Sequence, residues 1–305
     1  MRNISFDTLK VLLAIMVVGA HTYVLIEINP QLSFYLWNGL FRVAVPLFFI
    51  MSGYYLPRVS DNAEYIQRFL KILFMYIVWM VIYSPFYIPH DIERGGVYII
   101  KEIVVGYWHL WYLPAMMFAV LAIAFVRKIG LRTIIVLAIF LYVIGCAIQY
   151  YAFYGNSGSI PYCLYRNGFF FAVPFVIVGF IYNDIRDMLD KYKYIMLAVG
   201  GVLFAIEVYI ASLHPRDIHG FDLYLSLILV CPAIFAITKS MPPFRTTMPL
   251  SKVSSAIYFI HPAFIFAAGQ IGIIYGTQVF VFALAFSLLA TIPMIFISRR
   301  LHFLL

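Results

Sequence analysis

Runs of mostly apolar residues, each about 20 residues long, recur along nearly the whole of this 305-residue chain. A helix rises about 1.5 Å per residue, so a run of that length crosses the hydrocarbon core of a bilayer. Unbroken runs of this kind exclude a transmembrane β-barrel, whose strands alternate apolar and polar residues. The sequence therefore predicts an all-α, polytopic integral membrane protein with about ten transmembrane helices. The predicted spans are 8–27, 34–56, 69–89, 107–126, 131–152, 166–183, 193–212, 222–239, 252–270 and 277–298.

Charged residues are scarce, at 11% of the chain against about 25% in soluble domains. No polar stretch is long enough for a soluble domain, so residues 1–305 are predicted to form one membrane-embedded domain. The basic residues do not gather on one soluble face, so the net charge of +8 does not indicate nucleic-acid binding. No small-residue cleavage site follows the first apolar run, which favours a retained helix over a signal peptide.

The three cysteines, Cys146, Cys163 and Cys231, have no metal-ligand spacing. Cys146 and Cys231 lie inside apolar runs, which favours packing roles over a structural disulfide. The sequence thus predicts no metal site.

The distribution of lysine and arginine predicts the orientation. With the N-terminus in the cytoplasm, sixteen of the 21 lysines and arginines fall on the cytoplasmic side, four fall outside, and Arg42 lies within a span. Cytoplasmic loops are enriched in these residues. Both termini are therefore predicted to be cytoplasmic, in agreement with an even number of spans. The largest outer loops, 90–106 and 153–165, are long enough to close over a bulky external acceptor.

Four ionisable residues lie deep in the predicted spans: His21, Arg42, His261 and Glu207. An ionisable residue inside a membrane is a candidate for function, and the alternative is a polar core group with satisfied hydrogen bonds. Histidine can act as a general base near neutral pH, and arginine can hold an oxyanion. By the predicted topology His21, Arg42 and the His109–Leu113 segment share the outer or middle part of the membrane. Glu207 has no motif around it, and we assign it the structural role.

A second candidate group is basic and cytoplasmic. Arg68 and Lys71 are three residues apart, so they share one face of the third predicted helix, and Arg58 lies just upstream. One interpretation is ordinary anchoring of a cytoplasmic helix end. The other is a clamp for phosphate groups, such as the pyrophosphate of coenzyme A.

Several short motifs occur in a specific order and cover nearly the whole chain: Asp7-x-x-Lys10, Lys10-x10-His21, Arg42–Gly53, Arg68-x-x-Lys71, His109–Leu113, Arg166–Phe175 and Ser255–Pro262. In this order they make the chain resemble acyltransferase family 3, a family of membrane-bound acyltransferases. In the Arg68-x-x-Lys71 motif the family usually has two arginines, so Lys71 departs from the pattern.

The resemblance implies transfer of an acyl group, most often acetyl, from cytoplasmic acyl-CoA to a hydroxyl of a cell-envelope glycan at the bacterial cytoplasmic (inner) membrane. It implies that His21 is the catalytic histidine and that Lys10, Arg68 and Lys71 contact the donor, with acyl-CoA as a substrate and no permanently bound cofactor. We add Arg42 as a catalytic candidate. Whether His21 acts as a base or as an acyl carrier stays open, as does the oligomeric state. Further candidates on the acceptor side are Asp7, His109, Trp111, Arg166 and His261.

Two segments, Trp108–Pro114 and Arg166–Phe175, also resemble the membrane domain of the membrane-bound serine racemases of vancomycin-resistance clusters. That domain is associated with serine supply. The resemblance leaves a second hypothesis open, a carrier for a small polar metabolite such as serine. The absence of a visible internal repeat weakens a transporter of the inverted-repeat type.

The orientation can be tested with single cysteines introduced at Ser157 and Asn183. We expect a membrane-impermeant thiol reagent to label position 157 from outside and position 183 from inside. Reversed accessibility would contradict the orientation, and equal accessibility of both positions would contradict the number of spans.

Overall fold

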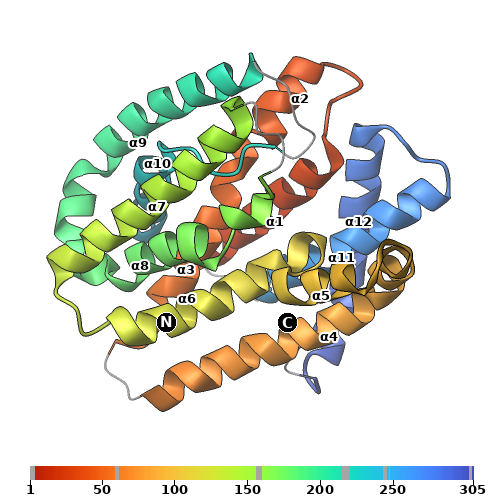
Figure 1. Ribbon diagram of the computed structural model, residues 1–305, viewed down its shortest axis with the longest axis horizontal. Coiled ribbons are helices and arrows are strands. Elements are labelled where there is room, and N and C mark those ends of the chain that lie inside the picture. Colours follow the sequence, from red (N-terminus) through yellow and green to blue (C-terminus); the bar gives the residue numbers. More distant parts are fainter. Residues whose placement is uncertain are drawn as a thin grey trace. The chain divides into compact units, whose positions relative to one another are not determined.

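The computed structural model describes residues 4–58, 62–155, 160–213, 220–242, 246, 248–301 and 304–305. All elements of these residues are helical (Figure 1). They form two compact units, the first made of residues 1–48, 183–303 and 305 and the second of 49–182 and 304. Of the two positions proposed for labelling, Asn183 is exposed, whereas Ser157 lies outside the described residues.

The first unit contains the first and the last apolar helices of the chain, and its centre is the packing of α1 against α11 and α12. Figure 1 shows α11 and α12 as the two blue helices. The helices of the first unit are α1 (Ile4–Thr22), α2 (Pro30–Trp37), η1 (Leu40–Val43), α9 (Tyr182–Ser212), α10 (Leu227–Ser240), α11 (Leu250–Gln270) and α12 (Gly276–Ile297). Helix α3 (Ala44–Tyr54) continues from the first unit into the second.

The second unit is arranged around α6, which packs against α4, η4 and α8. Close backbone contact joins α3 to α8: a Cβ on Gly179 would lie 1.9 Å from the carbonyl oxygen of Ile50, so only glycine fits there. The helices of the second unit are α4 (Asn62–Arg94), α5 (Gly96–Val105), η2 (Trp108–Trp111), α6 (Tyr112–Val126), α7 (Leu131–Tyr154), η3 (Tyr162–Leu164), the π-turn η4 (Gly168–Ala172) and α8 (Val173–Phe180).

The all-α membrane architecture predicted from the sequence is confirmed. Among the described residues, eight helical segments are long and apolar enough to cross a membrane, and two shorter apolar helices, Gly168–Phe180 and Leu227–Ser240, fall on the other two predicted spans. Each predicted span therefore contains an apolar helix. The total of ten crossings and the cytoplasmic termini stay predictions.

Several boundaries differ from prediction. Residues 90–106, predicted to be an outer loop, extend α4 to Arg94 and form the whole of α5, because their charges sit within a valine- and isoleucine-rich helical segment. The predicted span 34–56 begins instead at Pro30 and is broken at η1. Asn29 starts α2, since its side chain accepts a hydrogen bond from the Leu32 N–H at 2.9 Å and Pro30 fits the first turn.

The first helix ends five residues earlier than predicted, at Thr22. Tyr23 and Leu25 have φ of +52° and +69°, a left-handed backbone conformation that cannot continue a right-handed helix. His21 therefore lies in the last turn of α1 rather than two-thirds of the way along a longer span. One residue of α1 therefore separates His21 from the turn that begins at Tyr23.

That turn is attached to α12 by Glu27. The carboxylate of Glu27 accepts hydrogen bonds from the Thr277 N–H at 3.0 and 3.3 Å, and the Leu25 N–H donates to the Thr277 hydroxyl at 2.9 Å. A carboxylate at a helix N-terminus is favourable because it satisfies N–H groups and opposes the helix dipole. The bond from the Thr277 side chain, with bonds from the Glu27 and Thr277 backbone, lowers the pKa of Glu27 below its ordinary 4.5.

This attachment predicts a pH dependence of stability. Because the native pKa of Glu27 lies below that of the unfolded chain, its contribution is fully present above the ordinary 4.5 and is lost as the pH falls through the lower native value. We expect Glu27→Gln to lower the thermal unfolding midpoint at pH 7 and to differ less from the wild type near pH 4. A difference that grows toward acidic pH would contradict the assignment.

Candidate functional site

Two histidines that the sequence offered separately lie side by side in the first unit. The rings of His21, in the last turn of α1, and His261, in the middle of α11, have centroids 5.2 Å apart and an interplanar angle of 82°. His261 is fully buried, whereas His21 is half-buried. The His261 Nδ1 lies 3.1 Å from the Ile257 carbonyl oxygen. A carbonyl only accepts, so Nδ1 carries a hydrogen and donates it to this oxygen.

Small and branched residues one and two turns away position this histidine pair. Ala14 and Val18 on α1 pack against Ile257 on α11 and Ala283 on α12, and all four are buried. Val18 and Ile257 lie three and four residues before the two histidines, so they share the histidines' helix faces. The packing that joins α1 to α11 therefore also aligns His21 with His261.

The opposite end of α1 carries the Asp7-x-x-Lys10 motif. Asp7 is buried, and its carboxylate lies 3.7 Å from the Lys10 ammonium. The Lys10 carbonyl accepts a hydrogen bond from the buried Ser254 hydroxyl of α11 at 2.7 Å. Lys10 is eleven residues from His21, about 16 Å along the helix. The bond between Ser254 and Lys10 fixes the α1–α11 contact at the end of α1 that lies away from the histidines.

Arg42 is held by a partner that sequence reasoning missed. Its guanidinium lies 2.5 Å from the Asp222 carboxylate and 3.3 Å from the Asn38 side-chain oxygen. Asn38 also accepts from the Phe221 N–H at 2.5 Å and, through its carbonyl, from the Tyr224 hydroxyl at 2.5 Å. This arrangement, which we call the Arg42 network, consists of Arg42, Asp222, Asn38 and Tyr224. Its charge is balanced internally.

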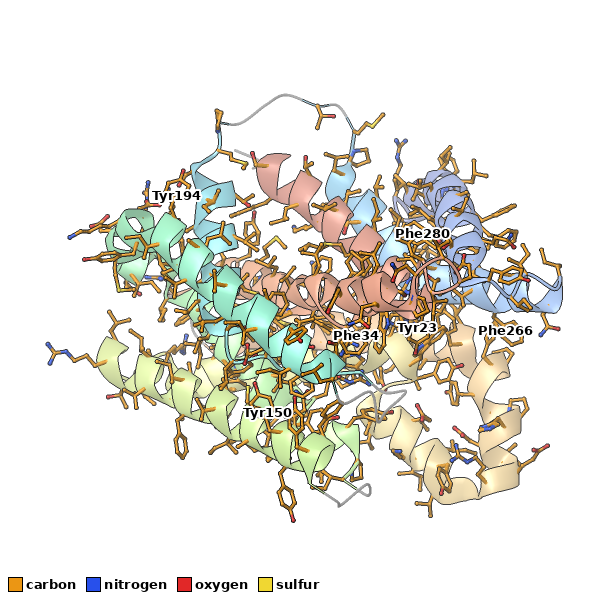
Figure 2. All side chains as sticks on the ribbon, turned by 90° about the horizontal axis from the view of Figure 1, so that it is seen from above. Tyr23, Phe34, Tyr150, Tyr194, Phe266 and Phe280 are labelled. Atoms are coloured by element: carbon orange, nitrogen blue, oxygen red, sulfur yellow. The ribbon has the colours of Figure 1, made fainter. Side chains whose placement is uncertain are left out.

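Trp37 links the Arg42 network to the end of α1. The Arg42 guanidinium lies 5.4 Å from the Trp37 ring centroid, and Tyr23 meets the same ring edge-on at 4.9 Å. Phe34 also contacts Trp37, and Figure 2 labels Tyr23 and Phe34 in this part of the unit. Tyr23 is two residues after His21. The structure thus brings Arg42 to the same end of α1 as His21, with an aromatic cluster between.

Glu207, the fourth deep ionisable residue, has the structural role that the sequence suggested. Its carboxylate accepts the N–H groups of Leu225 and Ser226 at 2.9 and 3.0 Å, and also the Ser226 hydroxyl. These bonds hold the segment that leads into α10. No chemistry is assigned to Glu207.

In the second unit, the aromatic motif residues surround Arg166. Its guanidinium lies 4.4 Å from the Tyr162 ring centroid and 5.0 Å from that of Trp111, and Trp111 stacks on Phe171 at 5.9 Å. The next residue, Asn167, accepts from the Phe169 and Phe170 N–H groups and so starts η4. Two motifs far apart in sequence, His109–Leu113 and Arg166–Phe175, therefore form one structure.

His109 is buried in the same unit, where its ring meets Tyr83 edge-on at 5.1 Å. It belongs to η2, which begins at Trp108 with a φ of +45°. The tight turn lets His109 leave the surface while Trp108 stays exposed. His109 is thus part of the aromatic packing between α4 and η2.

The basic pair Arg68 and Lys71 lies on the exposed face of α4. Within the described parts of the chain, neither forms a hydrogen bond or an ion pair. Arg127 is a basic neighbour that the sequence did not single out: it donates to the Asn62 side chain at 2.9 Å and lies over Tyr65 at 5.0 Å, and Arg68 also acts electrostatically on Tyr65. Arg58 instead donates to the Phe180 carbonyl at 2.5 Å. The charges of Arg68 and Lys71 are therefore open to an anionic ligand.

The apolar helices define a multi-pass membrane protein. The chain belongs to the acyltransferase domain family, which matches residues 3–299. This match confirms the family resemblance predicted from the sequence, and it supports a membrane acyltransferase.

Three relatives with curated names are racemases. An amino-acid racemase from Enterococcus faecalis is 25% identical over 289 residues, covering 85% of this chain and 40% of the relative. A second from that species is 31% identical over 214 residues, covering 63% and 30%. A serine/alanine racemase from Enterococcus gallinarum is 25% identical over 293 residues, covering 86% and 41%. The chain thus spans less than half the length of these relatives. No solved structure matches it.

The buried ion pair of the Arg42 network generates a stability prediction. The side chains of Arg42 and Asp222 are only 16% and 7% exposed, so Asp222→Ala leaves a charge poorly solvated. Removing one partner of such a pair costs roughly 3–5 kcal/mol. We expect this loss in the free energy of unfolding of the detergent-solubilised protein.

The matched control is Arg186→Ala in the same unit, because the Arg186–Asp190 pair is 63% and 31% exposed. An exposed helical pair contributes only about 0.3–0.5 kcal/mol. The double variant Arg42→Ala/Asp222→Ala should lose less stability than the two single losses together. Equal effects of Asp222→Ala and Arg186→Ala would contradict a buried, interdependent pair.

Proposed function

We propose that this protein is an acyl-CoA-dependent O-acyltransferase of the bacterial cytoplasmic membrane that acylates, most often acetylates, a hydroxyl of a cell-envelope glycan. The observation that carries the proposal is the contact between His21 and His261, at 5.2 Å between ring centroids, in a chain of the acyltransferase domain family. A half-buried histidine beside a fully buried one is a suitable arrangement for a general base with an orienting neighbour.

In this proposal His21 takes the proton of the acceptor hydroxyl. The hydroxyl oxygen attacks the thioester carbonyl carbon, the tetrahedral intermediate collapses with cleavage of the carbon–sulfur bond, and the proton passes to the departing CoA thiolate. His261, whose Nδ1 is fixed on the Ile257 carbonyl, acts as a positioning residue for His21. Arg42 supplies guanidinium N–H donors near the end of α1, and Asp222 holds the guanidinium in place.

Donor binding is assigned to the exposed basic face of α4. Arg68 and Lys71 are exposed and so accessible to a phosphate group, and Arg127 adds positive charge around Tyr65. Because lysine binds phosphate as a point charge rather than through a bidentate fork, Arg68 carries the larger share of this role.

A carrier for serine or a similar small metabolite is the second candidate, and the similarity to relatives named amino-acid racemase and serine/alanine racemase favours an amino acid as the molecule handled. The two hypotheses differ in the molecule that they require. A carrier moves labelled serine into proteoliposomes without CoA, whereas an acyltransferase releases CoA from acetyl-CoA and moves no serine. Serine uptake by the wild type, unaffected by acetyl-CoA, would replace the proposed function.

The catalytic role of His21 predicts a loss of rate. General base catalysis contributes typically about 10²–10⁴-fold, so His21→Ala and His21→Gln should each lower turnover by that factor and leave acetyl-CoA binding nearly unchanged. The measurement is CoA release from acetyl-CoA by proteoliposomes supplied with envelope glycan. Turnover close to the wild type in both variants would exclude His21 as the base.

The donor role of Arg68 predicts a loss of affinity. A hydrogen bond to a charged group contributes about 1.5–3 kcal/mol, so Arg68→Ala should weaken acetyl-CoA binding by roughly tenfold to a hundredfold. Higher salt should weaken binding to the wild type as well. Arg132→Ala, a change of another exposed arginine of the second unit, is the control and should leave the affinity unchanged. Unaltered affinity in Arg68→Ala would leave this residue as a topological anchor.

A further inference from the structure

Two carboxylates lie near each other where α4 and α5 meet in the second unit. Asp91, close to the end of α4, is only 4% exposed, and Glu102, in the last turn of α5, is half-buried. The Tyr76 hydroxyl of α4 donates to the Ile103 carbonyl at 2.8 Å and so holds this end of α5 in place. Burial, and after it the charge of Asp91, raises the pKa of Glu102. The two carboxylates are therefore close enough to repel each other.

Neither carboxylate is fully satisfied by the chain. Among the described residues, the buried Oδ2 of Asp91 has no hydrogen-bond partner, and its Oδ1 lies 3.4 Å from Nδ1 of the exposed His90. The Glu102 carboxylate forms neither a hydrogen bond nor an ion pair within the same part of the chain, and only its backbone carbonyl accepts, from the Tyr76 hydroxyl at 3.3 Å. A buried carboxylate oxygen without a donor is unfavourable. These oxygens are therefore suited to accept hydrogen bonds from a ligand.

The nearest basic residues are directed at aromatic rings instead. Arg94 and Lys101 act electrostatically on Glu102. The Arg94 guanidinium lies 4.5 Å from the Tyr98 ring centroid, and the Lys101 ammonium lies 5.8 Å from that of Tyr162. In the described ranges neither basic group is within ion-pair distance of either carboxylate. A cationic ligand would therefore find two carboxylates that no cation of the chain contacts directly.

Tyrosine rings border the carboxylates. Asp91 and Glu102 both act electrostatically on Tyr87 and Tyr107. The two tyrosine rings have centroids 5.2 Å apart at an interplanar angle of 34°, so they form one aromatic surface. Aromatic faces attract organic cations such as ammonium groups. The surroundings of the carboxylates thus favour an organic cation.

A metal ion suits this donor set less well. Ca²⁺ takes about six to eight oxygen ligands, and the described residues contain no group of three or more histidine, cysteine, aspartate or glutamate side chains that could hold a metal. A primary ammonium group has about three N–H donors to satisfy. Oxygens of Asp91 and Glu102 can accept that number.

The carboxylates adjoin the His109–Leu113 motif. The Tyr107 ring contacts Tyr83 at 6.2 Å between centroids, and Tyr83 in turn meets His109 edge-on at 5.1 Å. The predicted topology places residues 90–106 on the outer side of the membrane. A ligand bound here would therefore come from outside, as the proposed acceptor does.

From these observations we propose that Asp91 and Glu102 bind the protonated amino group of a small polar ligand against the rings of Tyr87 and Tyr107. Two molecules considered above can carry such a group, an amino sugar of the acceptor glycan and a free amino acid. The site itself goes beyond the proposed function, and its assignment to an amino sugar rests on that function.

The test measures binding of glucosamine and of L-serine to the full chain in lipid nanodiscs by saturation-transfer NMR, with empty nanodiscs as the baseline. N-acetylglucosamine and N-acetylserine are the matched ligands, because acetylation removes the positive charge. We expect at least one of the two amines to bind. Its N-acetyl form should bind at least about tenfold more weakly, since charge-assisted hydrogen bonds to the ammonium group are lost.

Conservative variants locate the site. Asp91→Asn and Glu102→Gln keep the shapes of the side chains, and each should weaken amine binding at least about tenfold. Glu93→Gln removes a charge from an exposed position of the same helix and should leave amine binding unchanged. Thermal midpoints close to that of the wild type would show that the variants are folded. If Asp91→Asn does not fold, the half-buried Glu102 carries the test.

The outcomes separate the alternatives. Failure of both amines to bind, equal binding of an amine and its N-acetyl form, or binding unchanged in the variants would overturn the inference. Binding of glucosamine alone assigns the site to the glycan, binding of serine alone assigns it to a free amino acid, and binding of both shows recognition of the amino group itself. His21→Ala should retain amine binding and lose acyl transfer. Amine binding that depends on Glu102 in a wild type without any acyl transfer would remove the proposed function and keep the site.

Discussion

The packing of α1 against α11 is the contact on which the proposed chemistry depends. It uses a small residue, Ala14, and branched residues, Val18 and Ile257, so the two helices approach closely. In a membrane, where lipid is as apolar as the helix surfaces, such close packing and interhelical hydrogen bonds drive association. The Ser254 hydroxyl supplies one such bond, to the Lys10 carbonyl. The histidine pair lies at the other end of this contact.

The end of α1 is equally constrained, and for a different reason. Left-handed backbone at Tyr23 and Leu25 terminates the helix directly after His21, and Glu27 then attaches the turn to the beginning of α12. His21, in the last turn of α1, is half-buried in the apolar unit and lies next to the turn that follows the helix. Trp37 extends the same region to Arg42. His21 and Arg42 thus belong to neighbouring elements of one unit.

The sequence predicted what depends on hydrophobic length and on local motifs. The all-helical, apolar architecture and the acyltransferase resemblance are confirmed because both follow from patterns along the sequence itself. Contacts between segments far apart in the chain could not be predicted from these patterns. His261 was a second-choice residue until α11 placed it against His21, and Asp222 was missed because nothing in its local sequence indicates a partner 180 residues away. The early end of α1 was also missed, since backbone conformation at Tyr23 leaves no compositional signal.

The central claim is that His21 and His261 act as one unit in acyl transfer, and a kinetic double-mutant cycle tests it most directly. CoA release from acetyl-CoA is measured for the wild type, His21→Ala, His261→Ala and the double variant in proteoliposomes with envelope glycan. If His261 works through His21, the double variant is no slower than His21→Ala alone, because residues that act together have non-additive effects. Losses that multiply in the double variant would show two independent roles and would contradict the account.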